Sequence, residues 1–233
     1  MQPDLDTFLQ SHTLPGKVIF GKVWGSWSHN TQTPVSDLDY LVVYQAPTAR
    51  LLSLHPPPET VDGQKPDFQA HEALKFCQLL LKGNPAIVEM LFTDRLCMKT
   101  APWTELESRR ERFLSRTVVR QYLGYAEGQL KRLVSHGPLH TAGGAYNEKW
   151  AYHLLRLLDD AERIARGEAP VVWKEGPERD FLMKVRTGEF PKERVERMAL
   201  DRMAAVNALQ PWPLLETGDE AVLERWLLDL RGV

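Results

Sequence analysis

One segment, GKVWGSWSHNTQTPVSDLDYLVVY at residues 21–44, constrains this chain more than any other. An apolar run from Val18 to Trp24 leads into a Gly-Ser pair, and a second apolar run from Tyr40 to Tyr44 follows two aspartates. Short apolar runs bounded by turn residues are typical of strands. The segment therefore predicts a strand, a tight turn and a second strand that opens with acidic side chains.

The two aspartates are Asp37 and Asp39, separated by Leu38. Alternation along a strand places residues i and i+2 on one face, so we expect both carboxylates to point the same way. Paired carboxylates form a hard oxygen site of the kind that magnesium prefers. An isolated Asp-x-Asp pair is more often a solvated turn or a helix cap. The flanking strands favour the metal-site interpretation here.

The Gly-Ser pair, Gly25 and Ser26, suits phosphate binding. Glycine lets the backbone approach a phosphate closely, and a serine hydroxyl with neighbouring amides can donate hydrogen bonds to its oxygens. Nucleotidyl transfer needs two divalent cations, carboxylates to hold them and donors around a triphosphate. The Gly-Ser pair with the two aspartates fits this chemistry and resembles the signature of a nucleotidyl-transfer site.

A site of this kind needs a third carboxylate, and Asp67 is the candidate. It follows a proline-rich loop, where a short extended segment would lie beside the strand of the first two aspartates. The alternative is that Asp67 caps a helix that begins near His71, a position that aspartate often takes. Asp62, in the same loop, is the next candidate.

The Gly-Ser and Asp-Leu-Asp elements resemble those of the polymerase-beta-like nucleotidyltransferase superfamily. A narrower resemblance, through KGNPAIVEMLF and through EKWAYHLLRLLDDAERIARGEAPV in the second half, is to polymerase-beta-type nucleotidyltransferases associated with RNA repair. It implies an α+β fold: a mixed sheet with flanking helices in a catalytic domain (1–100), then an all-helical carboxy-terminal domain (101–233). Members often carry Arg-Ala-Tyr-Gly after the Gly-Ser pair. This chain has Trp27-Ser28-His29-Asn30, which removes a guanidinium suited to phosphate.

The resemblance also implies an activity: a nucleoside monophosphate passes from a nucleoside triphosphate, such as ATP, to a hydroxyl acceptor. It favours an RNA end as acceptor; a protein hydroxyl is the alternative, and a non-catalytic nucleotide- or RNA-binding module is a third possibility. It implies that two Mg²⁺ or Mn²⁺ ions bind to Asp37, Asp39 and Asp67. The nucleotide would contact residues of the first segment: Gly25, Ser26 and Ser36.

A second group of polar residues lies in the helical half. Lys149, His153 and Arg156 are spaced i, i+4 and i+7, which places them on one face of a predicted helix. This face is a candidate binding site for triphosphate or for an acceptor phosphate. Charged residues opposite an apolar face are equally typical of any surface helix.

Hydrophobic periodicity predicts the remaining elements coarsely. In the first hundred residues we expect a loop at 47–66, a helix at 71–82 and a strand at 87–92. Glu89 interrupts that strand, either as an acid facing the cleft or as an edge charge. Beyond residue 100 only helices are expected: a stripe from Leu106 to Leu133 that ends at Gly137-Pro138, then 146–166, 179–186, 191–208 and a last helix with a Thr217/Glu220 capping box.

Composition narrows the class of protein. The 233 residues carry a formal net charge of −2, so a strong general affinity for long nucleic acid is not indicated. Arginines do cluster locally, at Arg109–Arg112, Arg116 and Arg120, either as a one-sided basic patch or as a solvated helix face. Two cysteines, no signal-peptide pattern and no long apolar run predict a cytoplasmic protein without a membrane partner.

Overall fold

The computed structural model describes residues 5–64, 66–135 and 146–233. The chain forms two compact units that we treat separately. The sheet unit comprises residues 1–82, 86–113 and 219–233, and the helical unit comprises 83–85 and 114–218. The division at residue 100 stays a prediction about domains.

The sheet unit contains a mixed five-stranded sheet in the order β3-β4-β2-β1-β5. Strand β1 pairs antiparallel with β2 and with β5, β3 pairs antiparallel with β4, and β2 pairs parallel with β4. The strands are β1 Lys17–Trp24, β2 Asp39–Gln45, β3 Thr60–Gly63, β4 Phe68–Glu72 and β5 Cys97–Lys99. The predicted α+β class, a mixed sheet with flanking helices followed by a helical region, is confirmed.

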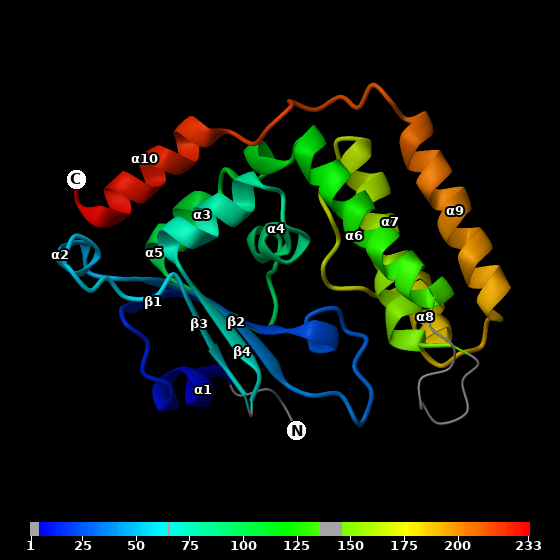
Figure 1. Ribbon diagram of the computed structural model, residues 1–233, viewed down its shortest axis with the longest axis horizontal. Coiled ribbons are helices and arrows are strands. Elements are labelled where there is room, and N and C mark those ends of the chain that lie inside the picture. The colour runs from blue at the N-terminus through cyan, green and yellow to red at the C-terminus, as the bar shows by residue number, and fades with distance from the viewer. Residues whose placement is uncertain (1–4, 65, 136–145) are drawn as a thin grey trace. The chain divides into compact units, whose positions relative to one another are not determined.

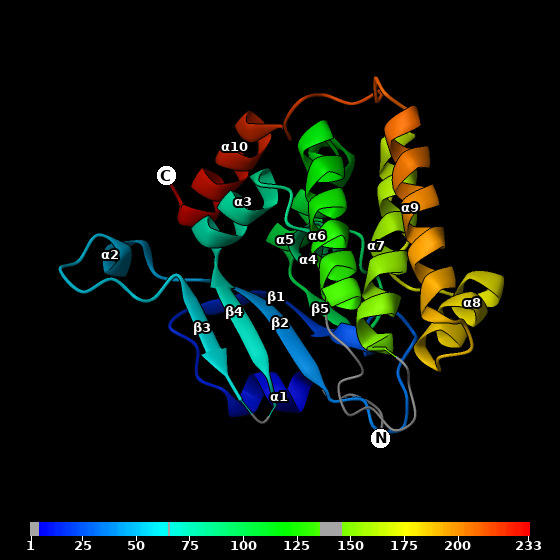
Figure 2. The same ribbon diagram turned by 45° about the vertical axis from the view of Figure 1, so that its right-hand side comes forward.

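Helices cover both faces of this sheet, with α1 on one face and α3 and α5 on the other (Figure 1; Figure 2). The helices of the unit are α1 Leu5–Ser11, α2 Thr48–Leu51, α3 Ala73–Leu81, α4 Pro85–Leu91, α5 Ala101–Glu107 and α10 Glu220–Arg231. Short 3₁₀ turns lie at Gly25–Trp27 and Arg110–Phe113. Because side chains alternate along each strand, the sheet supplies an apolar surface to both helical layers.

Aromatic side chains fill both layers. On the α1 face, Phe8 stacks on Tyr40 with ring centroids 4.0 Å apart. On the opposite face, Phe20 stacks on Trp103 at the same centroid distance. Offset or stacked aromatic pairs of this kind add to the hydrophobic stabilisation that burial supplies. The core therefore holds the strands on which the acidic residues lie.

Helix α10, from the end of the chain, packs within the sheet unit. Its Trp226 lies 6.2 Å from Phe76 of α3 between ring centroids, and the indole N–H donates to the carbonyl of Pro102. Arg231 forms an ion pair with Glu72, 2.8 Å between Nη2 and Oε1. Glu72 also accepts a hydrogen bond from the Leu74 amide as the N-cap of α3. The end of the chain therefore fixes the start of α3.

The helical unit consists of α6 Arg116–Ser135, α7 Glu148–Ala165, α8 Gly176–Arg186 and α9 Lys192–Ala208. Helix α7 lies between α6 and α9 and also contacts α8 (Figure 2). Most of its residues are buried for this reason. Gly167, with φ of +84°, ends this helix as the sequence predicts.

Several expected elements need correction. The strand predicted at 87–92 is wrong, because this segment is helix α4. The helix predicted from His71 begins at Ala73, and His71 belongs to β4. The stripe from Leu106 to Leu133 is divided among α5, a 3₁₀ turn and α6, and its predicted end at Gly137-Pro138 lies outside the described residues. The last helix is capped by Asp219, whose side chain accepts from the Val222 amide, rather than by Thr217.

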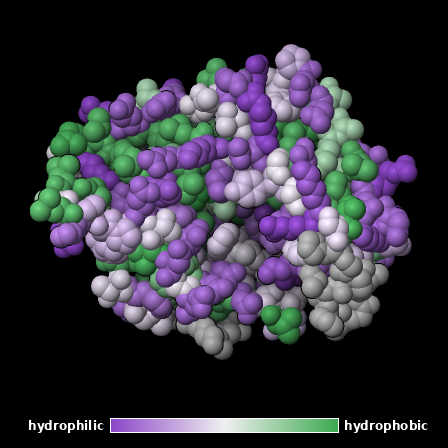
Figure 3. Space-filling model, in the orientation of Figure 1, coloured by the Kyte–Doolittle hydropathy of each residue, from purple (hydrophilic) through white to green (hydrophobic). Residues whose placement is uncertain are grey.

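Exposed apolar side chains gather near α2. Leu52 and Leu54 are 83% and 95% exposed, and hydrophobic surface covers this part of the sheet unit in Figure 3. Across the three described ranges, no helix combines the length and the apolar character that a membrane crossing requires.

Candidate functional site

The parallel pairing of β2 with β4 brings two aspartates together. Tyr40 is the register partner of Phe68, and the Tyr40 amide donates to the Asp67 carbonyl at 2.9 Å. Asp39 directly precedes Tyr40, and Asp67 directly precedes Phe68. The two aspartates are therefore neighbours at the same end of the sheet. The expected extended segment beside the first acidic strand is confirmed. The helix-cap alternative for Asp67 is wrong, because Glu72 caps α3.

A cavity of about 560 Å³ opens at this end of the sheet. Three of its lining residues are acids from adjacent strands: Asp39, Asp62 and Asp67. Asp62 on β3 faces Gln69 on β4, whose side-chain amide donates to the Asp62 carboxylate at 3.0 Å. Asp62, the fallback candidate from the sequence, thus lies in the same cavity as Asp39 and Asp67.

Asp37 is placed differently from the prediction. It lies in the loop before β2, is exposed, and is not among the residues that line the cavity. Strand alternation does not extend to Asp37, because β2 begins only at Asp39, so the alignment of the two carboxylates stays a prediction. The preceding Ser36 is held in a turn, where its hydroxyl accepts from the Thr33 amide at 2.8 Å.

Gly25 lies directly against Asp39. Its φ of +69° falls in the left-handed region that favours glycine. A Cβ atom at this position would lie 2.8 Å from the Asp39 Oδ2 atom, closer than such contacts allow. The Gly-Ser turn and the acidic strand, 14 positions apart in the sequence, therefore meet at one point of the structure.

The loop after Gly25 is held by its own hydrogen bonds. The Ser26 carbonyl accepts from the amides of His29 and Thr31, at 3.3 and 3.0 Å. The Ser28 hydroxyl donates to the Gly25 carbonyl at 2.9 Å. These bonds fix a compact turn next to the cavity-lining Asp39.

A buried polar cluster connects this loop to α4. His29 and Glu89 are 2% and 1% exposed, with 3.6 Å between His29 Nε2 and Glu89 Oε2. Fully buried Lys22 donates to the Thr93 hydroxyl at 3.0 Å, and that hydroxyl donates to the Glu89 carbonyl at 2.6 Å. Buried charges are retained when they are paired and hydrogen-bonded, so this cluster ties β1, the Gly-Ser loop and α4 together.

His29 is a residue that the sequence reasoning missed as a member of the site. It occupies the stretch that departs from the usual family pattern, and its burial beside Glu89 gives that departure a structural role. The available signal was the pair of charged residues, Lys22 and Glu89, inside otherwise apolar runs. The edge-strand role of Glu89 is wrong, since Glu89 lies on a helix and is buried; its role as an acid near the cleft stays a prediction.

The acids fit a hard cation in donor type, and the two-cation site stays a prediction. Asp39 and Asp67 present oxygen ligands from adjacent strand ends, as magnesium requires. Within the described ranges, however, no group of three or more histidine, cysteine, aspartate or glutamate residues has the arrangement that holds a metal ion.

In the helical unit, the predicted basic face of α7 contains three different environments. Lys149 is exposed, His153 is half-buried and Arg156 is buried. Burial lowers the pKa of His153 to about 3, assisted by the positive charges of Arg156, Lys149 and Arg186. The histidine is therefore neutral at physiological pH. The interpretation as an ordinary solvated stripe is wrong for Arg156, which is 6% exposed.

Arg156 belongs to a buried ionic cluster around Asp160. Its Nη1 atom lies 3.8 Å from Asp160 Oδ2, and Lys174 donates to Asp160 Oδ1 at 3.0 Å. The same oxygen accepts from the Val171 amide at 3.1 Å. Lys174 also donates to Glu178 at 2.7 Å. This cluster joins α7 to the segment that leads into α8.

Comparison with known proteins identifies the family of this chain. A search among curated proteins gave no match. A family model described as RlaP, RNA repair pathway DNA polymerase beta family, matches residues 1–210. That range contains the Gly-Ser turn, all the cavity acids and α7, and it confirms the resemblance stated from the sequence. The chain belongs to the RNA repair pathway DNA polymerase beta family.

Proposed function

We propose that this protein transfers a nucleoside monophosphate from a nucleoside triphosphate to the hydroxyl of an RNA end during RNA repair. The observation that carries the proposal is the meeting of Asp39, Asp67 and Gly25 at one end of the sheet. Membership in a polymerase-beta family of an RNA repair pathway suggests this reaction class.

In the proposed reaction, Asp39 and Asp67 would hold a Mg²⁺ or Mn²⁺ pair, and Asp37 would supply a third carboxylate from its loop. Asp62, already in the cavity, is the alternative third ligand. Divalent cations supply positive charge against the triphosphate and lower the pKa of an attacking hydroxyl. The chain contributes carboxylates from adjacent strand ends that line one cavity, and ligands positioned in advance favour catalysis.

Gly25, Ser26 and Ser36 are proposed to contact the triphosphate. The absence of a side chain at Gly25 leaves room beside Asp39, and the Ser26 hydroxyl follows it in a turn that internal hydrogen bonds fix. Preorganised donors stabilise developing phosphate charge better than mobile ones. The buried His29–Glu89 contact supports the proposal by holding this turn in place.

Lys149 and His153, which belong to the helical unit, are also proposed to bind nucleotide. Lys149 is exposed, and a lysine side chain is suited to contact a phosphate oxygen. His153 would act as a neutral hydrogen-bonding partner, because burial keeps its pKa near 3.

The test is incubation with each α-labelled nucleoside triphosphate and Mg²⁺ or Mn²⁺, with RNA, DNA and protein offered in parallel. Label on the RNA 3′ end, with pyrophosphate release, is the expected result. Label on protein instead would favour the protein-hydroxyl alternative, and binding without pyrophosphate release would favour a non-catalytic module. Asp39→Asn should abolish labelling, whereas Asp6→Asn, an exposed aspartate on α1, should not.

A further inference from the structure

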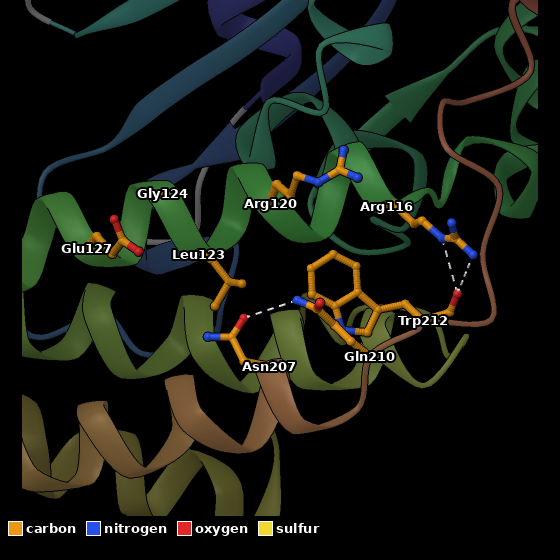
Figure 4. Close-up of a pocket in the computed structure, with 8 residues that line it drawn as sticks. All are labelled: Arg116, Arg120, Leu123, Gly124, Glu127, Asn207, Gln210 and Trp212. Carbon is orange, nitrogen blue, oxygen red and sulfur yellow. Dashed lines mark hydrogen bonds between the residues drawn. The ribbon is translucent and has the colours of Figure 1, made fainter.

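A second cavity, of about 430 Å³, lies wholly within the helical unit (Figure 4). Trp212 and Leu123, which are 5% and 8% exposed, give it an apolar floor. Its rim is polar and comes from α6 and from the end of α9 with the following segment: Arg116, Arg120, Glu127, Asn207 and Gln210. The size is within the range of pockets that hold small ligands, roughly 300–1,000 Å³.

The two arginines lie one helical turn apart on α6. Their side chains are 39% and 51% exposed. Arg116 donates to the Trp212 carbonyl through both Nε and Nη2, at 3.3 and 3.2 Å, which orients its guanidinium at one end of the cavity (Figure 4). Arg120 donates to Glu216 at 2.6 Å. Planar guanidinium groups in fixed positions match the geometry of phosphate oxygens.

Two carboxamides lie on the opposite edge. Asn207 and Gln210 are exposed, and the Gln210 side-chain amide lies 3.5 Å from the Asn207 carboxamide oxygen (Figure 4). Carboxamides both donate and accept hydrogen bonds, which suits base edges and ribose hydroxyls. The rim thus combines phosphate-type and base-type partners around an apolar floor.

Gly124 keeps the α6 side of this cavity open. A Cβ atom built on it meets no heavy atom within 4 Å, and the same holds for Gly128 one turn later. Only Gly124 lines the cavity. Glycine in the middle of a helix lowers stability relative to alanine. No neighbouring atom requires glycine at position 124, so a glycine beside open space is unusual there.

We propose that this cavity binds one unstacked nucleotide of a single-stranded RNA, with its phosphate at Arg116 and Arg120 and its base over Trp212 and Leu123. The proposal rests on the proposed function in one respect, that the acceptor is RNA. Unstacked bases read by side-chain hydrogen bonds are the usual targets in RNA recognition. A local arginine pair also explains how a chain with net charge −2 can hold a polyanion.

Glu216 acts as an exchangeable counter-ion in this proposal. Its backbone is fixed, because its carbonyl accepts from the Thr117 amide at 3.1 Å and from the Thr117 hydroxyl at 2.8 Å. Its side chain is 60% exposed and pairs with both arginines. Exposed ion pairs contribute little to stability, so an RNA phosphate can replace the carboxylate.

The test is fluorescence anisotropy with an unstructured, labelled oligoribonucleotide, without nucleoside triphosphate. Gly124→Leu fills the cavity and should weaken binding at least 10-fold. The matched control Gly128→Leu changes the same residue type on the same helix and should leave affinity within 2-fold. Circular dichroism melting of both variants establishes that each is folded. Equal affinities for the two folded variants would overturn the proposal.

Two charge variants should change the RNA affinity in opposite directions. Arg120→Gln should weaken RNA binding about 5-fold and lessen its salt dependence, because one phosphate contact is lost. Glu216→Gln should strengthen binding several-fold, because the competing carboxylate is removed. Weaker binding by Glu216→Gln contradicts the counter-ion role. Equal affinity for the matching DNA strand, or displacement of RNA by a free nucleoside triphosphate, would overturn the assignment to RNA.

All binding measurements use the Asp39→Asn background as well as the unmodified chain. RNA binding that persists in Asp39→Asn, with transfer abolished, separates the helical-unit cavity from the reaction site. Failure of the labelling experiment with intact, Gly124-dependent RNA binding would reject the proposed reaction alone. Normal RNA labelling with RNA affinity unaffected by Gly124→Leu would reject the cavity alone.

Discussion

The acids at the end of the sheet and the acid at the centre of α7 are held in opposite ways. Asp67 is exposed and Asp39 partly so; strand pairing positions both, and Asp39 also lies against Gly25. Asp160 is completely buried and is surrounded by Lys174, Arg156 and the Val171 amide.

The difference separates a site that can receive a ligand from a cluster that stabilises a fold. Where the backbone places a carboxylate, its oxygens stay accessible to a cation from solution. Where side-chain ion pairs place it, its charge is already balanced in the interior. Substitutions should therefore affect activity in the first region and stability in the second.

Asp39→Asn should give the largest effect. We expect turnover to fall by on the order of 10³-fold, because one charged ligand in the reaction site becomes neutral. The thermal midpoint should change little, since the side chain is only partly buried. Single-turnover kinetics measure the loss of turnover, and a melting curve measures the thermal midpoint. Retained turnover would remove Asp39 from the mechanism.

Asp160→Ala should have the reverse effect, with a large loss of stability and little change in turnover. Removing one partner of a buried ion cluster costs about 3–5 kcal/mol, because Lys174 then remains buried with less compensating charge. Urea unfolding measures this loss, and turnover per folded molecule should stay within about 2-fold. Asp180→Ala, an exposed aspartate on α8, is the control and should change stability by less than about 0.5 kcal/mol. A similarly small change for Asp160→Ala would contradict the contrast.

His153 sharpens the comparison through pH. Its pKa is about 3 in the folded chain against an ordinary value of 6.5, so between these values the unfolded state binds the proton and the folded state does not. The stability that His153 contributes is therefore present above pH 6.5 and is lost as the pH falls towards 3, at up to about 1.4 kcal/mol per pH unit.

The measurement is unfolding free energy at several pH values for the unmodified chain and for His153→Gln. The variant should lose less stability on acidification, so the difference between the two should move in its favour below pH 6.5. Parallel curves would show that His153 is protonated equally in both states.

Lys149→Ala should give the smallest effect. The Michaelis constant for the nucleoside triphosphate should rise about 3- to 10-fold with turnover nearly constant, as expected for loss of one exposed phosphate contact. Lys184→Ala, another exposed lysine of the helical unit, should leave both constants unchanged. If Lys149→Ala behaves like Lys184→Ala, Lys149 is only a surface residue.

The sequence predicted those parts of the site that depend on local pattern. Apolar runs located β1 and β2, and the extended segment after the proline-rich loop placed Asp67 beside Asp39. The segment 87–92 was misassigned because Ile87, Val88, Met90 and Leu91 are all buried, so the pattern lacks a period that separates helix from strand. Pro85 at the start of a helix was the better signal.

Features that depend on distant contacts could not be read from local pattern. The burial of His29 against Glu89 joins residues 60 positions apart, and no periodicity reports such a pair. The short strands β3 and β5 exist because neighbouring strands offer hydrogen bonds, which a window of a few residues does not contain. The roles of the site residues in ligand binding, including those of Asp37, Lys149 and His153, stay predictions.

Helix α10 has a consequence for how the chain matures. Its Trp226 and Arg231 complete the layer over α3. In the sequence, however, the entire helical unit lies between α3 and α10. On the ribosome, the residues of the helical unit emerge while Phe76 and Glu72 still lack these partners. The sheet unit therefore reaches its finished form only after residues 219–231 have been synthesised.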